Sequence, residues 1–167
     1  MLENHAKLMA VLQSSGEIVG RKKLQKMIFI AKKLNFPFYE KYDFHFYGPY
    51  SEEVTLKIEE LVNLGLVVET QEKVGGYVQY RYSLSDKGEQ FLTNYDVNPL
   101  ALRRCVKVMN RESARFLELV STMMYFEHLE KHDIIHKVSV VKEKQYYTER
   151  ELADAFEFIE TLKTLIH

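Results

Sequence analysis

The residues with the clearest chemical potential are three histidines spaced four positions apart, His128, His132 and His136. On one continuous helix, two neighbours at this spacing can share a metal ion, as paired histidines do in zinc sites. All three cannot, because at a rise of ~1.5 Å per residue they span about 12 Å. If the helix ends between them, the cluster is a polar surface turn. We predict no metal site, with His128 and His132 as the fallback candidates.

The sequence shows no pairing of a nucleophile with a base. It contains no GxSxG, HExxH or CxxC motif and no glycine-rich loop that would cradle a phosphate. A dispersed acid–base pair would leave no such motif. The single cysteine, Cys105, excludes an internal disulfide and is expected to behave as a small buried hydrophobe. We predict that the protein is not an enzyme and uses no cofactor.

Composition and length fit one well-buried core, or one small domain with a helical extension. The chain has 167 residues, of which 46% are hydrophobic, and its formal net charge is −1. Any attraction to nucleic acid must therefore come from a local patch. The N-terminus does not resemble a signal peptide, and no stretch approaches the ~20 apolar residues of a membrane span. We expect a cytoplasmic protein without membrane contact.

The first half combines helices with short strands. Periodicity and end signals predict helices over 2–13, 21–34, 52–64 and 86–95 and strands over 42–47, 66–70 and 77–84. A rigid turn at Tyr47–Ser51, built on Gly48 and Pro49, is expected to lead into the third helix, with Ser51 as its N-cap. Gly75 and Gly76 fit a tight hairpin turn. This order is that of a winged helix-turn-helix with a small β wing.

The second half is predicted to be all helical. Asn98 is expected to cap a helix that has Pro99 in its first turn and runs to about residue 109. A largely apolar helix is expected over about 111–128, and residues 138–144 are ambiguous. Thr148 and Glu151 have the spacing of a capping box at the start of the last helix. We predict a mostly α, α+β protein, with a winged-helix module (1–95) packed on a helical part (96–167).

Charge argues against standard DNA docking by this module. A winged helix inserts its third helix into the major groove, but the segment 52–64 carries four acids and one base, Lys57. DNA affinity depends largely on neutralising phosphates, so this helix disfavours nucleic acid as a partner.

The second helix is strongly basic. Residues 20–41 carry seven basic side chains and one acid, Glu40. The basic side chains are Arg21, Lys22, Lys23, Lys26, Lys32, Lys33 and Lys41. They form a solvated face, a docking surface for an acidic protein, or a weak contact to a nucleic-acid backbone. Tyr47 and Tyr50 nearby are either core residues or part of such an interface, where tyrosine is enriched.

Two segments carry a family resemblance. The sequence KLQKMIFIAKKL, which begins at Lys23, and the aromatic strand and turn FHFYGPYS resemble the YwgA-like family of small bacterial proteins. More remotely, Lys23–Lys26 and Tyr47–Pro49 resemble the Panacea (SocA-like) antitoxin domain, and the C-terminal segments ELVSTMMYF and TERELADAFEFIETL extend the likeness over most of the chain. The resemblance implies a non-enzymatic, winged-helix-like fold. Panacea-type proteins act as antitoxins or adaptors that grip another protein.

Together these observations predict a regulatory or adaptor protein that binds a protein partner through the helix 21–34 and the turn Tyr47–Ser51. The expected partner-binding side chains are Arg21, Lys22, Lys23, Lys26, Lys33, Tyr47 and Tyr50. The alternative is a DNA-binding transcriptional regulator that dimerises through its C-terminal helices, whose apolar faces also fit a homodimer seam.

Overall fold

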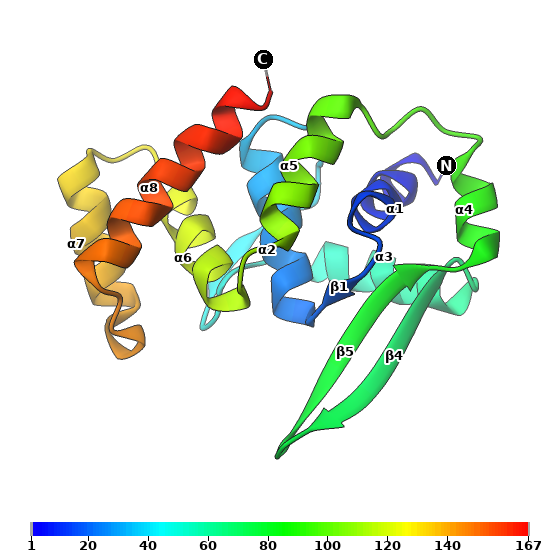
Figure 1. The fold of residues 1–167 in the computed structure, drawn as a ribbon, viewed down its shortest axis with the longest axis horizontal. Helices are drawn as coiled ribbons and strands as arrows, with labels where there is room; N and C mark the ends of the chain where they lie inside the picture. The colour runs from blue at the N-terminus through cyan, green and yellow to red at the C-terminus, as the bar shows by residue number, and fades with distance from the viewer. Residues whose placement is uncertain (1, 167) are drawn as a thin grey trace.

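The computed structural model describes residues 2–166, which form a mostly helical α+β protein (Figure 1). The first half contains α1 (Glu3–Ser15), β1 (Ile18–Val19), α2 (Arg21–Lys33), β2 (Asp43–His45), β3 (Gly48–Tyr50), α3 (Glu52–Asn63), β4 (Val67–Val74), β5 (Tyr77–Leu84) and α4 (Asp86–Leu92). The second half contains α5 (Leu100–Asn110), α6 (Ala114–Tyr125), α7 (Lys131–Val141), the 3₁₀ turn η1 (Glu143–Gln145) and α8 (Glu149–Thr164). Among these helices none is both long and apolar enough to cross a bilayer.

Side-chain caps fix several helix starts as predicted. The Ser51 hydroxyl accepts from the backbone N–H of Val54 at the start of α3, and Thr148 and Glu151 form a reciprocal capping box on α8. The predicted Asn98 cap is wrong. Pro99 occupies the N-cap position of α5, and the Asn98 side chain instead donates to Gln13 on α1.

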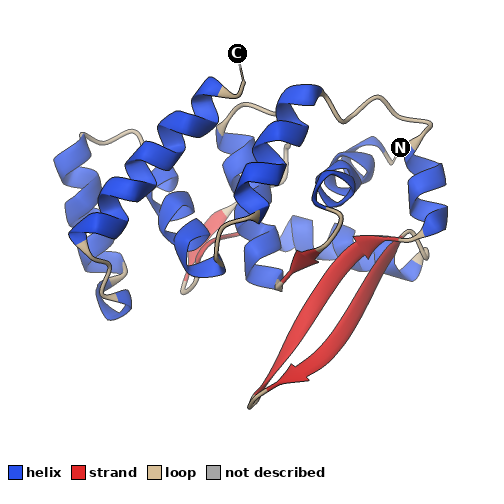
Figure 2. Cartoon of the chain, viewed as in Figure 1, coloured by secondary structure: helices blue, strands red, loops and turns tan. Residues whose placement is uncertain are grey.

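Three strands form an antiparallel sheet in the order β1-β5-β4. The strands β4 and β5 pair along their full lengths, from Val67 opposite Leu84 to Val74 opposite Tyr77, and β1 covers only the base of β5. Figure 2 shows this β4–β5 ribbon projecting away from the helices. β4 extends beyond the predicted end at residue 70, because the polar segment 70–74 has a full set of partners on β5.

A second small sheet corrects the predicted turn. The strands β2 and β3 form a hairpin in which Phe46 and Tyr47 make the two-residue turn between the paired residues His45 and Gly48. The predicted Tyr47–Ser51 turn is therefore largely a strand. The expected strand 42–47 ends at His45, and Phe46 is 78% exposed at the hairpin tip.

The buried apolar residues of both halves form one continuous core. Helix α2 lies at its centre and packs against α5 and α6 from the second half (Figure 1). Cys105 on α5 is fully buried, as expected, and burial raises the pKa of its thiol to about 11. The predicted helix 111–128 is shorter at both ends, because Ser113 caps α6 and the helix ends at Tyr125.

Candidate functional site

The side chain of Gln25 joins α2 to the start of α3. Its amide nitrogen donates to the carbonyl of Ser51 at 2.9 Å and to the hydroxyl of Thr55 at 3.0 Å. Its amide oxygen accepts from the backbone N–H of Ser51 at 3.0 Å. Gln25 is buried, so these bonds satisfy backbone groups that water cannot reach. This side chain therefore fixes where α3 begins relative to α2.

The next residue, Lys26, holds the adjoining strand. Lys26 is only 2% exposed, and its ammonium group donates to the carbonyl of Pro49 on β3 at 3.0 Å. Burial, and to a smaller extent repulsion from Lys142 and Lys22, lower its pKa to about 8, although Glu118 on α6 opposes that change. The expected exposure of Lys26 on a basic helix face is therefore wrong.

A buried charge cluster lies behind the hairpin. Lys142, which follows α7, donates to the carbonyl of Phe46 at 2.8 Å and lies 3.5 Å from the Glu118 carboxylate. Burial lowers the pKa of Lys142. Two lysines thus share one carboxylate, and both bind backbone carbonyls of the same hairpin. The second half of the chain thereby holds the β2–β3 hairpin in place.

Gly48 suits this position because of its backbone conformation. Its φ of +92° lies in a region that residues with a Cβ rarely adopt, whereas a Cβ here would make only ordinary van der Waals contacts, 3.5 Å from Lys26, Glu118 and Thr122. The Gly48 backbone therefore fits directly over the charge cluster. The segments KLQKMIFIAKKL and FHFYGPYS are therefore parts of one contact. Gln25 of the first segment binds the backbone of Ser51 in the second, and Lys26 binds that of Pro49.

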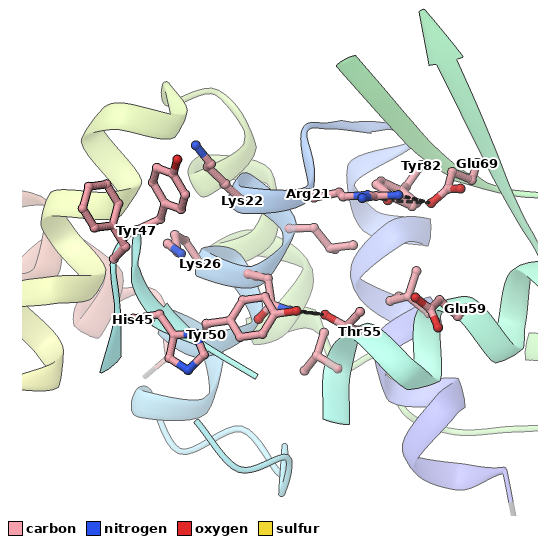
Figure 3. Close-up of a pocket in the computed structure, with 15 residues that line it drawn as sticks. Arg21, Lys22, Lys26, His45, Tyr47, Tyr50, Thr55, Glu59, Glu69 and Tyr82 are labelled. Carbon is pink, nitrogen blue, oxygen red and sulfur yellow. Dashed lines mark hydrogen bonds and ion pairs between the residues drawn. The ribbon is translucent and has the colours of Figure 1, made fainter. Parts of the chain in front are cut away.

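A groove of about 590 Å³ opens between this hairpin, the N-terminal part of α2, α3 and the base of the β4–β5 ribbon. Figure 3 shows the side chains that surround it. Its lining is mostly apolar, from Leu24, Val54, Ile58 and the ring of Tyr50. Tyr50 is held in place by its hydroxyl, 2.9 Å from that of Thr55, and by stacking on His45. A groove of this size and lining is typical of binding sites.

Two cationic side chains of α2 point to opposite ends of the groove (Figure 3). Lys22 lies with its ammonium 3.4 Å from the centre of the Tyr47 ring, at the hairpin end. Arg21 lies over the ring of Tyr80 at the ribbon end and donates to the hydroxyl of Tyr82, which in turn donates to Glu69. Arg21 is thus balanced by an acid, whereas Lys22 makes no ion pair within residues 2–166.

The other predicted partner-binding lysines do not reach this groove. Lys23 donates to the carbonyl of Asn110 at the end of α5, and Lys33 pairs with Glu127 at 2.8 Å. Both connect α2 to the second half of the chain. The structure therefore brings together Arg21, Lys22, Lys26, Tyr47 and Tyr50, and places Lys23 and Lys33 elsewhere.

The histidine row does not lie on one helix. His128 lies between α6 and α7, while His132 and His136 lie on α7 and are exposed. His132 lies 3.3 Å from its neighbour Asp133. Among residues 2–166 there is no group of three or more histidine, cysteine or acidic side chains arranged to hold a metal.

Sequence reasoning did not identify Glu118 or Lys142 as parts of this region. Glu118 had a usable signal, because it is the only charged residue within the apolar stretch 116–126, and a lone acid in a buried helix requires a partner. Lys142 had none, because it lies in a segment of ambiguous structure far from the hairpin in sequence.

The buried ammonium of Lys26 predicts a pH-dependent stability. In the folded protein its pKa is about 8, against 10.5 as the reference for the unfolded chain, so the native state loses this proton first as pH rises. Between these values the contribution of Lys26 to stability increases with pH. We expect the stability advantage of the wild type over Lys26→Met, measured by urea denaturation, to grow by about 2 kcal/mol from about pH 7 to about pH 9.5. The wild type and Lys26→Met have all their other titrating groups in common.

The matched control is Lys41→Met, at an exposed lysine. The stability advantage of the wild type over this variant should not grow with pH, and an equal change for both variants would contradict the prediction.

Comparison with known proteins places this arrangement in a family. No family model matches the chain. It is 58% identical over 165 residues to the uncharacterized protein YwgA of Bacillus subtilis (strain 168), a match that covers 99% of each chain. Identity at this level over the full length means that the two proteins share the same fold. The chain therefore belongs to the YwgA-like family.

Proposed function

We propose that the chain is a non-enzymatic regulatory or adaptor protein that binds a protein partner at the groove between α2, α3 and the β2–β3 hairpin. The observation that carries the proposal is the hairpin tip. Phe46 is 78% and Tyr47 is 47% exposed beside a groove with apolar walls. Exposed aromatic residues on a rigid support are typical of protein interfaces, because they offer large contact areas at little cost in conformational entropy.

The polar groups of the groove support binding rather than catalysis. Lys26, Gln25 and Tyr50 are each engaged in hydrogen bonds that hold the groove walls together. These three side chains therefore stabilise the fold of the groove walls.

We also propose that the first half is a modified winged helix. The order α1-β1-α2-α3-β4-β5 and the sheet order β1-β5-β4 support it. The modification is the connection 34–51, which replaces the turn of three or four residues found between these helices in a helix-turn-helix. It carries the β2–β3 hairpin, which lies beside the face that would approach DNA.

Charge disfavours the alternative, a DNA-binding regulator. The acids Glu52, Glu59 and Glu60 of α3 are exposed. The single base of that helix, Lys57, is 2.7 Å from the buried Glu40 and does not offset them. The face that would have to follow a phosphate backbone is therefore acidic.

A photo-crosslinking amino acid at Phe46 tests the proposal. In source cells we expect the full-length protein with the crosslinker at this position to form one discrete adduct with another protein. The crosslinker at Tyr77, 62% exposed at the tip of the β4–β5 ribbon, is the matched control and should not form it. Equal adducts from both positions, or none, would contradict the proposed site. If the protein shifted the mobility of DNA in a gel at physiological salt, the result would favour the DNA-binding regulator instead.

A further inference from the structure

The two ends of the groove differ in charge, and this difference determines which kind of molecule the groove can bind. At the ribbon end, Arg21 is paired with Glu69 at 3.8 Å, and Glu59 also lines the wall. At the hairpin end, Lys22 projects from α2 without an acidic partner in the described chain, and Lys26 forms part of the wall. The groove is therefore positive at one end and neutral to negative at the other.

At the positive end of the groove, the lysine charges outnumber the carboxylates that could neutralise them. Lys26 and Lys142 share the Glu118 carboxylate, and the exposed Lys22 lies close enough to both for the three positive charges to repel one another. Three positive charges against one negative charge leave a local excess next to an apolar surface. Lys26 and Lys142 are buried, so their charges are weakly screened, and the exposed Lys22 is the one that an arriving anion can reach. An acidic group on the occupant would relieve this repulsion.

The apolar part of the groove specifies the other half of the occupant. Leu24, Val54 and Ile58 are buried in the groove wall, and Tyr50 forms a ring face beside them. Interfaces of this kind draw most of their affinity from a large apolar side chain inserted into such a pocket. Glu59 and Glu69 disfavour a polyanion such as RNA, because a chain of phosphates would run past them, whereas a single carboxylate at the hairpin end would not.

We propose that the groove binds a short peptide segment of the partner that inserts a large aliphatic or aromatic side chain against Tyr50 and Ile58 and places an adjacent carboxylate at Lys22. This inference rests on the proposed function and adds to it the chemistry of the partner. It makes Lys22 the residue that selects the partner, while Lys26 and Lys142 supply the positive background.

The test is a selection of short random peptides displayed on phage against the immobilised full-length protein. Enriched sequences are then synthesised, and their affinity is measured by fluorescence polarisation for the wild type, Lys22→Glu and Lys41→Glu. Lys41 is an exposed lysine outside the groove, so Lys41→Glu makes the same change in net charge. Thermal unfolding by circular dichroism checks that each variant is folded.

We expect the enriched peptides to carry an acidic residue close to an aromatic or large aliphatic one. Lys22→Glu should weaken their binding about tenfold or more, and Lys41→Glu should leave it within about twofold. Enriched peptides without an acid, or equal affinity for the wild type and Lys22→Glu, would overturn the acidic specificity. Failure to enrich any peptide would overturn the inference as a whole. The crosslinked adduct at Phe46 would persist in either case if the protein binds a partner through a larger folded surface, so the two proposals fail separately.

Discussion

Replacing Gln25 with alanine is expected to lower the free energy of unfolding by about 3 kcal/mol. The substitution removes the partner of the buried Ser51 N–H at the junction between α2 and α3, and one of the donors to the Ser51 C=O, which keeps its bond from the Thr55 N–H at 3.2 Å. A buried backbone group without a partner costs about 1–3 kcal/mol, and the cavity left by the side chain adds to that cost. Urea denaturation followed by circular dichroism measures the change.

The matched control is Gln13→Ala on α1. Gln13 makes hydrogen bonds to Glu89 and Asn98, but these are exposed, and we expect a loss below about 1 kcal/mol. If Gln25→Ala and Gln13→Ala proved equally mild, the junction between the two helices would not depend on Gln25. Because Gln25 also positions Thr55, which holds the Tyr50 ring, the same variant should bind the selected peptides more weakly even at temperatures where it remains folded.

Replacing Gly88 with alanine is expected to be at least as damaging. Gly88 lies in the first turn of α4, where the helix packs against the backbone of Leu66, directly before β4. An alanine Cβ would lie 2.0 Å from the carbonyl oxygen of Leu66, a backbone atom that cannot rotate away. That oxygen is also held by the N–H of Ser85 at 3.1 Å, so α4 itself would have to move. We expect a loss of about 3 kcal/mol or more.

The control for this prediction is Gly76→Ala in the turn of the β4–β5 ribbon. A Cβ there meets no atom within 4 Å, and Gly76 does not have a positive φ. We expect a change of about 0.5 kcal/mol or less by urea denaturation. Faster amide hydrogen exchange in α4 and β4 of Gly88→Ala would show that the contact itself has opened, whereas a wild-type stability for that variant would refute the proposed steric conflict.

Local signals in the sequence predicted most of the helices and strands. Ser51 and Thr148 were identifiable as caps because capping depends on neighbouring residues alone, and the structure confirms both. Asn98 was a false cap, because its side chain is taken up by α1, a contact between residues far apart in the sequence. Gly48 and Pro49 suggested a turn, but both lie on β3, where they pair with His45 and Phe44 of β2.

The candidate site was predictable only in part. The predicted partner-binding residues Lys22, Tyr47 and Tyr50 do border the groove. The basic helix suggested an exposed surface, but the structure engages Lys23, Lys26 and Lys33 in internal contacts. Whether a lysine points to solvent or to a backbone carbonyl depends on its tertiary neighbours, and those neighbours include residues as distant in sequence as Glu118 and Lys142.

The burial of Cys105 has a practical consequence. It is the only cysteine in the chain, and its thiol is fully enclosed with a raised pKa, so the reactive thiolate is scarce at neutral pH. A cysteine introduced at an exposed position such as Phe46 would therefore be the preferred target for a maleimide dye or spin label. The native protein can thus serve directly as the background for single-site spectroscopic labelling, without first removing its own thiol.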